Sequence, residues 1–235
     1  MNNRLKFNQI LPSLQQTCLL CASHQGGNLG LCEPCLNQLP WHNTAQCRQC
    51  ALMTNNEICG NCLSTSPSFD STSTLFSYDY PVDGLLQHYK YNANLNLANT
   101  FATLFLEKHH QHISTRNKVD CIIPMPMHQH RLKERGFNQA LEIAKLISKS
   151  LITKLDYASC LRIKHTPPQA SLNLQERIKN IKGAFQCTQN LHNLNVAIVD
   201  DVMTTGASLN ELAKTLKQAG AAHVECWVMA RTLPK

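Results

Sequence analysis

The chain has 235 residues, which is enough for one large hydrophobic core and a small additional module. Its net charge of +7 favours anionic ligands such as phosphates or nucleic acid, without deciding between them. No apolar run approaches the ~20 residues of a membrane helix, and the first residues lack a signal-peptide pattern. We therefore expect a cytoplasmic protein with no transmembrane segment.

Cysteine is concentrated near the beginning of the chain, where eight of the twelve cysteines form four Cys-x-x-Cys pairs. These pairs are Cys18–Cys21, Cys32–Cys35, Cys47–Cys50 and Cys59–Cys62. Two such pairs can hold one Zn²⁺ ion in a closed tetrahedral site, which is structural rather than catalytic. We predict a zinc-binding module over residues 1–65 with one or two ions. The spacing allows both sequential and cross-braced pairing.

Other interpretations of these residues are weaker. A redox role for one pair would not explain four regular pairs in a chain without an export signal. His24 and His42 could each replace a thiolate ligand, but we expect both on the surface. The four remaining cysteines are isolated and are predicted to fill core or surface positions. They are Cys121, Cys160, Cys187 and Cys226.

Residues 63–74 are rich in serine and threonine, which predicts a linker to a second domain over residues 66–235. Beyond the linker, helical spacing alternates with short apolar runs. We predict helices over 94–108, 136–151 and 208–219, and strands over 119–123, 196–199 and 223–229. This alternation predicts an α/β fold, a mostly parallel sheet flanked by helices, in which ligands bind beyond the carboxyl ends of the strands.

The segment VAIVDDVMTTGASL, residues 196–209, is the most informative part of this domain. An apolar strand is expected to end at Asp200 and Asp201, whose carboxylates could accept hydrogen bonds from a ribose diol. The loop that follows leads into a helix, and it consists of Thr204, Thr205, Gly206, Ala207 and Ser208. Its hydroxyls, its amides and the helix N-terminus together form an anion site. A phosphate site one sugar's length from a diol site suits a ribose 5-phosphate.

This segment has two other interpretations. Ser208 could simply cap the helix, with Glu211 completing a capping box. An apolar strand that ends in acidic residues also resembles an ATPase strand. The sequence contains no Gly-Lys pair, and so no P-loop, and it has no Gly-x-Gly-x-x-Gly dinucleotide motif.

Two further segments contain cations. Arg131, Lys133 and Arg135 precede a predicted helix and would suit a pyrophosphate or a nucleic-acid backbone. Taken alone, they are equally consistent with a solvated charged loop. Residues 164–185 form a long polar segment, which is typical of a functional lid or of a disordered loop. Within them, Glu176 and Arg177 are the candidate catalytic groups, and a surface charge is the alternative for Glu176.

Residues 196–209 resemble the phosphoribosyl pyrophosphate (PRPP) signature of type I phosphoribosyltransferases. Together with GFNQ at 136–139, the segments 78–91 and 166–185, and the Cys-x-x-Cys pairs, almost the whole chain resembles the ComF family of ComFC and GntX-like proteins. The resemblance implies a phosphoribosyltransferase fold with an N-terminal double zinc ribbon. It also implies that Asp200 and Asp201 hold the ribose hydroxyls, that residues 204–208 hold the 5-phosphate, and that Mg²⁺ bridges sugar and pyrophosphate.

The family is associated with natural transformation. The resemblance therefore implies single-stranded DNA as a ligand and the DNA-uptake machinery at the inner membrane as a partner. Tyr89, Tyr91 and Phe137 could stack on bases, although a core position is favoured for Phe137. The alternative is an active phosphoribosyltransferase that acts on a small nucleobase-like acceptor and has no nucleic-acid role. After the last strand we expect no C-terminal hood of the kind that recognises a free base. This expectation favours the DNA-handling hypothesis over the transferase.

Overall fold

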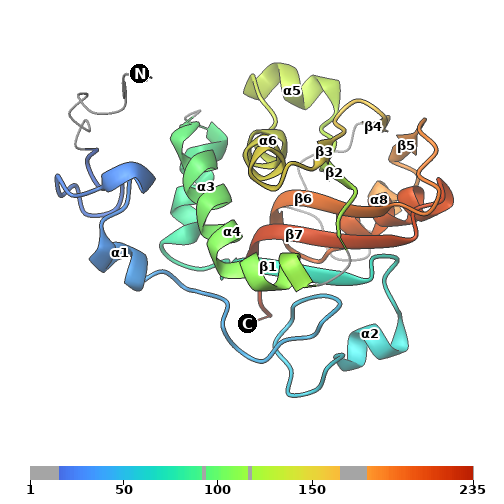
Figure 1. Cartoon of the computed structure of the whole chain (residues 1–235), viewed down its shortest axis with the longest axis horizontal. Helices are drawn as coiled ribbons and strands as arrows, with labels where there is room; N and C mark the ends of the chain where they lie inside the picture. Colours follow the sequence, from blue (N-terminus) through green and yellow to red (C-terminus); the bar gives the residue numbers. More distant parts are fainter. Residues whose placement is uncertain (1–15, 92–93, 116–117, 165–178, 235) are drawn as a thin grey trace, which may run out of the picture. The chain divides into compact units, whose positions relative to one another are not determined.

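The computed structural model describes residues 16–91, 94–115, 118–164 and 179–234 (Figure 1). The chain divides into two compact units, Met1–Leu39 and Pro40–Lys235, and each is described by itself. The expected domain boundary at residue 65 stays a prediction. By its contacts, the second half of the cysteine-rich region belongs to the same unit as the sheet.

The first unit is a short ribbon. It contains the 3₁₀ helix η1 (Gly27–Leu29) and the helix α1 (Glu33–Asn37). Cys32 occupies the N-cap position of α1, and a proline follows in its first turn, where no backbone N–H is needed. The Leu19 amide donates to the Gly30 carbonyl at 2.9 Å and thereby ties the first cysteine pair to the loop before the second.

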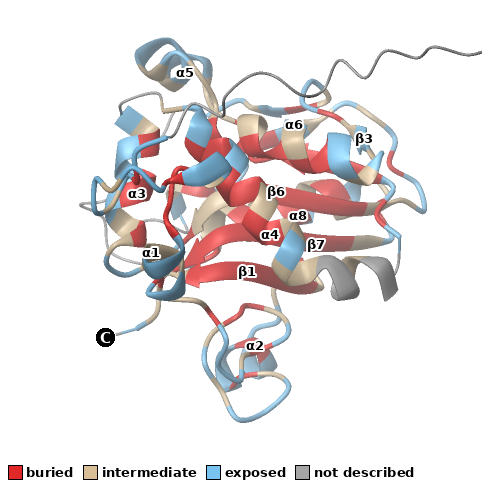
Figure 2. Cartoon of the chain, turned by 60° about the vertical axis from the view of Figure 1, so that its left-hand side comes forward, coloured by how far each residue is buried: buried red, intermediate tan, exposed pale blue. Residues whose placement is uncertain are grey.

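The second unit contains a five-stranded sheet in which every ladder is parallel. Its strands, in spatial order, are β1 (Ser71–Ser77), β7 (His223–Arg231), β6 (Asn195–Met203), β2 (Cys121–Pro124) and β3 (Lys154–Leu155). A separate antiparallel pair joins β4 (Cys160–Arg162) to β5 (Phe185–Cys187). The sheet's residues are mostly buried, as is typical of parallel strands covered on both faces (Figure 2).

Helices cover the sheet and connect its strands. They are α2 (Gly60–Ser64), α3 (Val82–Tyr91), α4 (Asn96–Thr115), α5 (Gln129–Arg135), α6 (Gln139–Leu151) and α8 (Ala207–Gln218). The connection through α8 runs across the sheet in the opposite direction to those through α4 and α6. The right-handed crossover rule therefore places α8 on the other face. The predicted fold class is confirmed.

Several helix and strand boundaries differ from those predicted from the sequence. The predicted linker over residues 63–74 is wrong in its second half, because residues 71–77 form β1. Threonine is β-branched and suits a strand, and the serine and threonine hydroxyls find partners in the interior. The Thr72 hydroxyl donates to the Gln49 carbonyl, and the Ser71 hydroxyl lies 3.5 Å from the Glu225 carboxylate. The helix α4 is longer than predicted, and residues 131–135 lie in α5 rather than in a loop.

The outer edge of β1 is covered by the segment that opens the second unit. Trp41 forms an antiparallel bridge with Phe76, and the Ser77 amide donates to the Pro40 carbonyl at 2.8 Å. His42 was expected on the surface, but it is buried, with Nδ1 3.1 Å from the Ser77 hydroxyl. This pairing protects an edge that would otherwise expose unpaired backbone groups.

Tyr89 belongs to the core. Its side chain is fully buried, its hydroxyl donates to the Gln139 carbonyl at 2.9 Å, and its ring centroid lies 6.0 Å from that of Phe101 and 5.7 Å from that of Phe137. Tyr89 is therefore a core residue, and its burial excludes the possibility that it stacks on bases. Of the three aromatic residues considered, Tyr91 is exposed.

We expect Tyr89→Phe to lower the free energy of unfolding by about 1 kcal/mol, because a buried hydrogen bond is lost. Binding of single-stranded DNA should not change. Urea unfolding and fluorescence anisotropy measure the two quantities. The exposed Tyr91→Phe variant is the control and should keep wild-type stability. Unchanged stability together with weaker DNA binding in Tyr89→Phe would contradict the core assignment.

Candidate functional site

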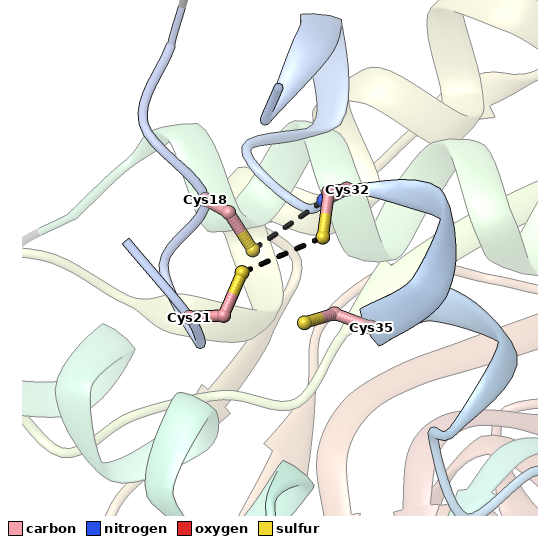
Figure 3. Close-up of side chains that lie close together, drawn as sticks. All are labelled: Cys18, Cys21, Cys32 and Cys35. Atoms are coloured by element: carbon pink, nitrogen blue, oxygen red, sulfur yellow. Dashed lines mark hydrogen bonds between the residues drawn. The ribbon is translucent and has the colours of Figure 1, made fainter. Parts of the chain in front are cut away.

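The eight paired cysteines form two separate clusters that follow sequential pairing. One contains Cys18, Cys21, Cys32 and Cys35, and the other contains Cys47, Cys50, Cys59 and Cys62. Within each cluster the four sulfur atoms lie within 4.8 Å of one another, and Figure 3 shows the first four side chains converging on one point. Four sulfur donors in this arrangement fit a closed tetrahedral Zn²⁺ site. His24 and His42 belong to neither cluster.

The backbone prepares one thiol in each cluster to act as a ligand. The Cys32 amide donates to Cys18 Sγ at 3.4 Å, and the Cys59 amide donates to Cys47 Sγ at 3.3 Å. Burial alone would raise the pKa of both thiols, but the backbone amide donors outweigh it. They lower the pKa of Cys18 to about 6 and that of Cys47 to about 7. Because the thiolate is the metal ligand, this environment favours zinc binding.

A cavity of about 340 Å³ lies beyond the carboxyl ends of β2 and β6. Three groups that the sequence predicted separately line it. They are the carboxylates of Asp200 and Asp201, the loop over residues 204–208, and the side chains of Arg131 and Arg135. Lys133 lies on the same helix as the arginines, but it is exposed and outside the lining. Because the groups predicted from the sequence line this space, we call it the main cavity, although the second cavity described below is larger.

Glycine is required where the loop turns into α8. Gly206 has φ +80°, and a Cβ atom there would lie 2.7 Å from the Met203 methyl carbon. The N-cap residue of α8 is Gly206, which has no side chain to cap the helix, and the Thr205 hydroxyl accepts a hydrogen bond from the Ala207 amide at 3.3 Å. The alternative interpretation, in which Ser208 and Glu211 form a capping box, is not observed, since Ser208 lies inside α8 and the Glu211 carboxylate accepts a hydrogen bond from the Gly183 amide at 2.7 Å. The N-terminal amides of α8 are thus placed to bind an anion together with the hydroxyls of the loop.

Asp200 and Asp201 lie within β6 and not after its end, because β7 pairs with β6 as far as Met203. Burial, and then the charge of Asp201, raise the pKa of Asp200 to about 8. Lys90 Nζ lies 2.9 Å from an Asp201 carboxylate oxygen, and their side chains are 21% and 13% exposed. Burial opposes the charge on Lys90, but Asp201 outweighs it and raises the pKa of Lys90.

The arginines come from two elements. Arg131 and Arg135 are one turn apart on α5, and Arg135 donates to the Gln139 side-chain oxygen at 3.2 Å while lying 5.4 Å above the Tyr91 ring. Arg162, at the end of β4, also lines the main cavity. Burial, and then the charge of Arg131, lower the pKa of Arg162.

Sequence reasoning missed both Lys90 and Arg162, since neither lies in a local motif and only the fold brings them to the acidic pair. The candidate catalytic residues Glu176 and Arg177 lie outside the described residues.

A second cavity, of about 500 Å³, shares a wall with the main cavity, formed by Pro126, Met127, Asn138 and Arg162. Much of its remaining lining is apolar and includes Leu132, Leu141, Tyr157, Leu161 and Ile163. Several of these side chains are exposed despite their size, and Tyr157 is 62% exposed. Large apolar side chains left in contact with water beside a cavity are typical of a binding site.

Comparison with known proteins identifies the family. Residues 7–63 match a family described as a double zinc ribbon domain, which agrees with the two cysteine clusters. The chain is 33% identical over 224 residues to Competence protein F of Haemophilus influenzae, covering 88% of this chain and 95% of that protein. The chain belongs to the ComF family.

Other ComF relatives span a similar length. DNA utilization protein YhgH of Escherichia coli K12 is 31% identical over 221 residues, covering 92% of this chain and 97% of the relative. Competence protein ComFC of Streptococcus pneumoniae is 22% identical over 231 residues, covering 98% and 96%.

Solved structures with some likeness include a purine phosphoribosyltransferase from Pyrococcus horikoshii. It is 17% identical, with a TM-score of 0.36, over 58% of this chain and 87% of that one. The AQ2163 protein from Aquifex aeolicus is 10% identical, with a TM-score of 0.37, over 68% and 88%. Within the described residues of the ComF protein, no helix is both long enough and apolar enough to cross a membrane.

Asp200 should titrate far from the range that is usual for an aspartate. An aspartate ordinarily ionises near pH ~4. Asp200 should instead ionise near pH 8. Between these values the folded protein holds a proton that the unfolded chain has released, so its stability should fall as pH rises towards 8. Carbon NMR of the aspartate carboxyl groups measures the titration directly.

Lys90→Met should raise the pKa of Asp200 further, because the charge of Lys90 lowers it in the wild type. Lys145→Met is the matched control. Lys145 is an exposed residue of α6, and its Nζ atom lies 2.8 Å from a carboxylate oxygen of Glu142 on the same helix. A wild-type Asp200 that titrates in the ordinary range would contradict this description of the site.

Proposed function

We propose that this ComF protein binds PRPP with Mg²⁺ in the main cavity and handles incoming single-stranded DNA inside the cell during natural transformation. The observation that supports the proposal best is the meeting of three groups in one cavity. A carboxylate pair, a loop of amides and hydroxyls, and two arginines all line it. These groups match, in turn, the diol, the 5-phosphate and the pyrophosphate of PRPP.

Each group has a role in this proposal. Asp200 and Asp201 accept hydrogen bonds from the ribose hydroxyls, and Lys90 offsets part of their repulsion. Residues 204–208 hold the 5-phosphate through amides at the start of α8 and through their hydroxyls. Arg131 and Arg135 contact the pyrophosphate, for which paired guanidinium groups are well suited. Mg²⁺ prefers carboxylate and phosphate oxygens, and it would supply positive charge between the acidic pair and the pyrophosphate.

Support for a DNA role comes from the relatives and from the second cavity. The relatives are named competence proteins and DNA utilization proteins. In the second cavity, Tyr157 offers an exposed ring on which a base could stack, and Arg162 adds a cation at the shared wall. Lys133, exposed on α5, would contact the nucleic-acid backbone. The DNA-uptake machinery at the inner membrane is the proposed protein partner.

The alternative function is an active phosphoribosyltransferase with a small nucleobase-like acceptor. The shared wall of the two cavities supports it, because an acceptor in the second cavity would lie beside a sugar phosphate in the main one. The two proposals differ in what occupies the second cavity. If a free base competes with single-stranded DNA for the second cavity, both proposals involve the same site. If the free base binds and single-stranded DNA does not, the transferase is favoured.

The double variant Asp200→Asn/Asp201→Asn should bind PRPP about 100-fold more weakly in the presence of Mg²⁺, because neutral amide acceptors replace the carboxylates that bind the ribose hydroxyls and attract Mg²⁺. Isothermal titration calorimetry measures the affinity, and circular dichroism verifies the fold. Asp120→Asn is the control, since this exposed residue lies just before β2, at the opposite end of that strand from the main cavity. Wild-type affinity in the double variant would refute the site.

Tyr157→Ala should weaken binding of a short single-stranded oligonucleotide about tenfold, because one stacking contact is lost. PRPP affinity should not change, and Tyr157→Phe should behave like the wild type. Tyr80→Ala is the matched control, because Tyr80 is 82% exposed and lines neither cavity. Equal DNA affinities for Tyr157→Ala and Tyr80→Ala would argue against a base in the second cavity.

A further inference from the structure

Arg231, the last residue of β7, lies between the second cysteine cluster and the loop that lines the main cavity. Its side chain is buried, with a relative exposure of 3%. The Nε atom donates to the carbonyl of Cys50 at 2.8 Å. The Nη1 atom donates to the carbonyl of Met203 at 3.0 Å and also to that of Thr204. One guanidinium group therefore contacts the backbone of a zinc ligand and the backbone of the loop.

This arrangement is unusual for a buried cation. Burial lowers the pKa of Arg231, and a charge in the interior is tolerated only where it is well hydrogen-bonded. Here the bonds that compensate for burial are to backbone carbonyls, including that of Thr232 at 2.8 Å. Because the guanidinium group is planar and rigid, it fixes the positions of these carbonyls relative to one another.

The carbonyl contacts also orient the amides that face the cavity. In a trans peptide, the C=O and the following N–H point in opposite directions. Holding the carbonyls of Met203 and Thr204 against Arg231 therefore directs the N–H groups of Thr204 and Thr205 away from it. Both threonines line the main cavity. The orientation of amides that could bind a phosphate thus depends on Arg231.

The second cysteine cluster is also attached directly to the sheet. The Thr72 amide of β1 donates to the Arg48 carbonyl at 3.0 Å, one residue before Gln49, whose carbonyl accepts from the Thr72 hydroxyl. We call the turn over residues 47–50 the Cys47–Cys50 knuckle. A Zn²⁺ ion bound to Cys50 would fix the conformation of this knuckle and, with it, the carbonyl that Arg231 contacts. Without the ion, the knuckle has no covalent or metal constraint, and a partner of Arg231 can move.

We infer that Arg231 is a positioning residue that couples zinc binding in the second cluster to the conformation of the loop over residues 204–208. Zinc at Cys47, Cys50, Cys59 and Cys62 holds the Cys50 carbonyl, Arg231 connects this carbonyl to the loop, and the loop amides stay in the anion-binding orientation. The coupling rests on the proposed function only for the identity of the ligand. Its structural part concerns the loop of the free protein.

The test is a double-mutant cycle on the full-length protein, using Arg231→Gln, Cys59→Ser and the double variant. Cys59→Ser should lower the zinc content by one ion per chain, as measured by native mass spectrometry. Each single variant should speed hydrogen exchange of the amides of residues 204–208 and weaken PRPP binding about tenfold. The double variant should be no worse than the single variants, because both changes break the same connection.

Arg48→Gln is the matched control. Arg48 is an exposed arginine of the same ribbon, and its side chain pairs with Glu57 at 3.2 Å rather than with the loop. It should leave loop exchange and zinc content unchanged. If Arg231→Gln fails to fold, Cys59→Ser still tests the coupling, and Arg231→Lys keeps the charge but loses the planar geometry.

The outcomes separate the coupling from the proposed ligand. Additive effects in the double variant, or wild-type loop exchange in folded Cys59→Ser, would overturn the coupling. A wild type that binds no PRPP, but whose loop exchange depends on Arg231 and Cys59, would uphold the coupling and refute the proposed ligand.

Discussion

The parallel pairing of β6 with β7 out to Met203 and Arg231 determines where the candidate groups lie. The pairing holds Asp200 and Asp201 in extended conformation, so that they project from a rigid strand rather than from a loop. It brings the last residue of β7 beside the start of the loop that turns into α8. Because both strands are buried between helices, these positions are set by the core and not by the surface.

The acidic pair is electrostatically strained without a ligand. Of the two adjacent carboxylates, Asp201 pairs with Lys90, while burial and the charge of Asp201 raise the pKa of Asp200 to about 8. Such a site gains from a ligand that brings hydroxyl donors or positive charge, and it binds a proton when neither is present. Perturbed carboxylates beside a cavity are concentrated at functional sites, which agrees with the role proposed for the pair. The anion-binding loop lies next to the pair, so one ligand can satisfy both.

Sequence reasoning located the groups whose chemistry is local. The cysteine pairs and residues 200–208 are contiguous motifs, and their spacing reflects the geometry of a knuckle or of a strand–loop–helix turn. Lys90 and Arg162 were missed because their roles depend on contacts with residues far along the chain. The strand β1 was mistaken for a linker because burial of its hydroxyl groups depends on partners such as Gln49 and Glu225, which the local sequence does not reveal. The contact that replaces the alternative capping box is also distant in sequence, since the Glu211 carboxylate accepts from the Gly183 amide.

The segment that covers the edge of β1 bears on how such a chain could be shortened or recombined in evolution. The cysteines suggest that the two ribbons form one exchangeable cassette. However, residues 40–50 pair with β1 and with Arg231, so they complete the sheet in the manner of an additional strand. Removing both ribbons together would leave β1 open to pairing with other chains. The first ribbon belongs to the other compact unit, and none of the five strands described for the sheet comes from it, so the two ribbons, although alike in their ligands, are free to have different evolutionary histories.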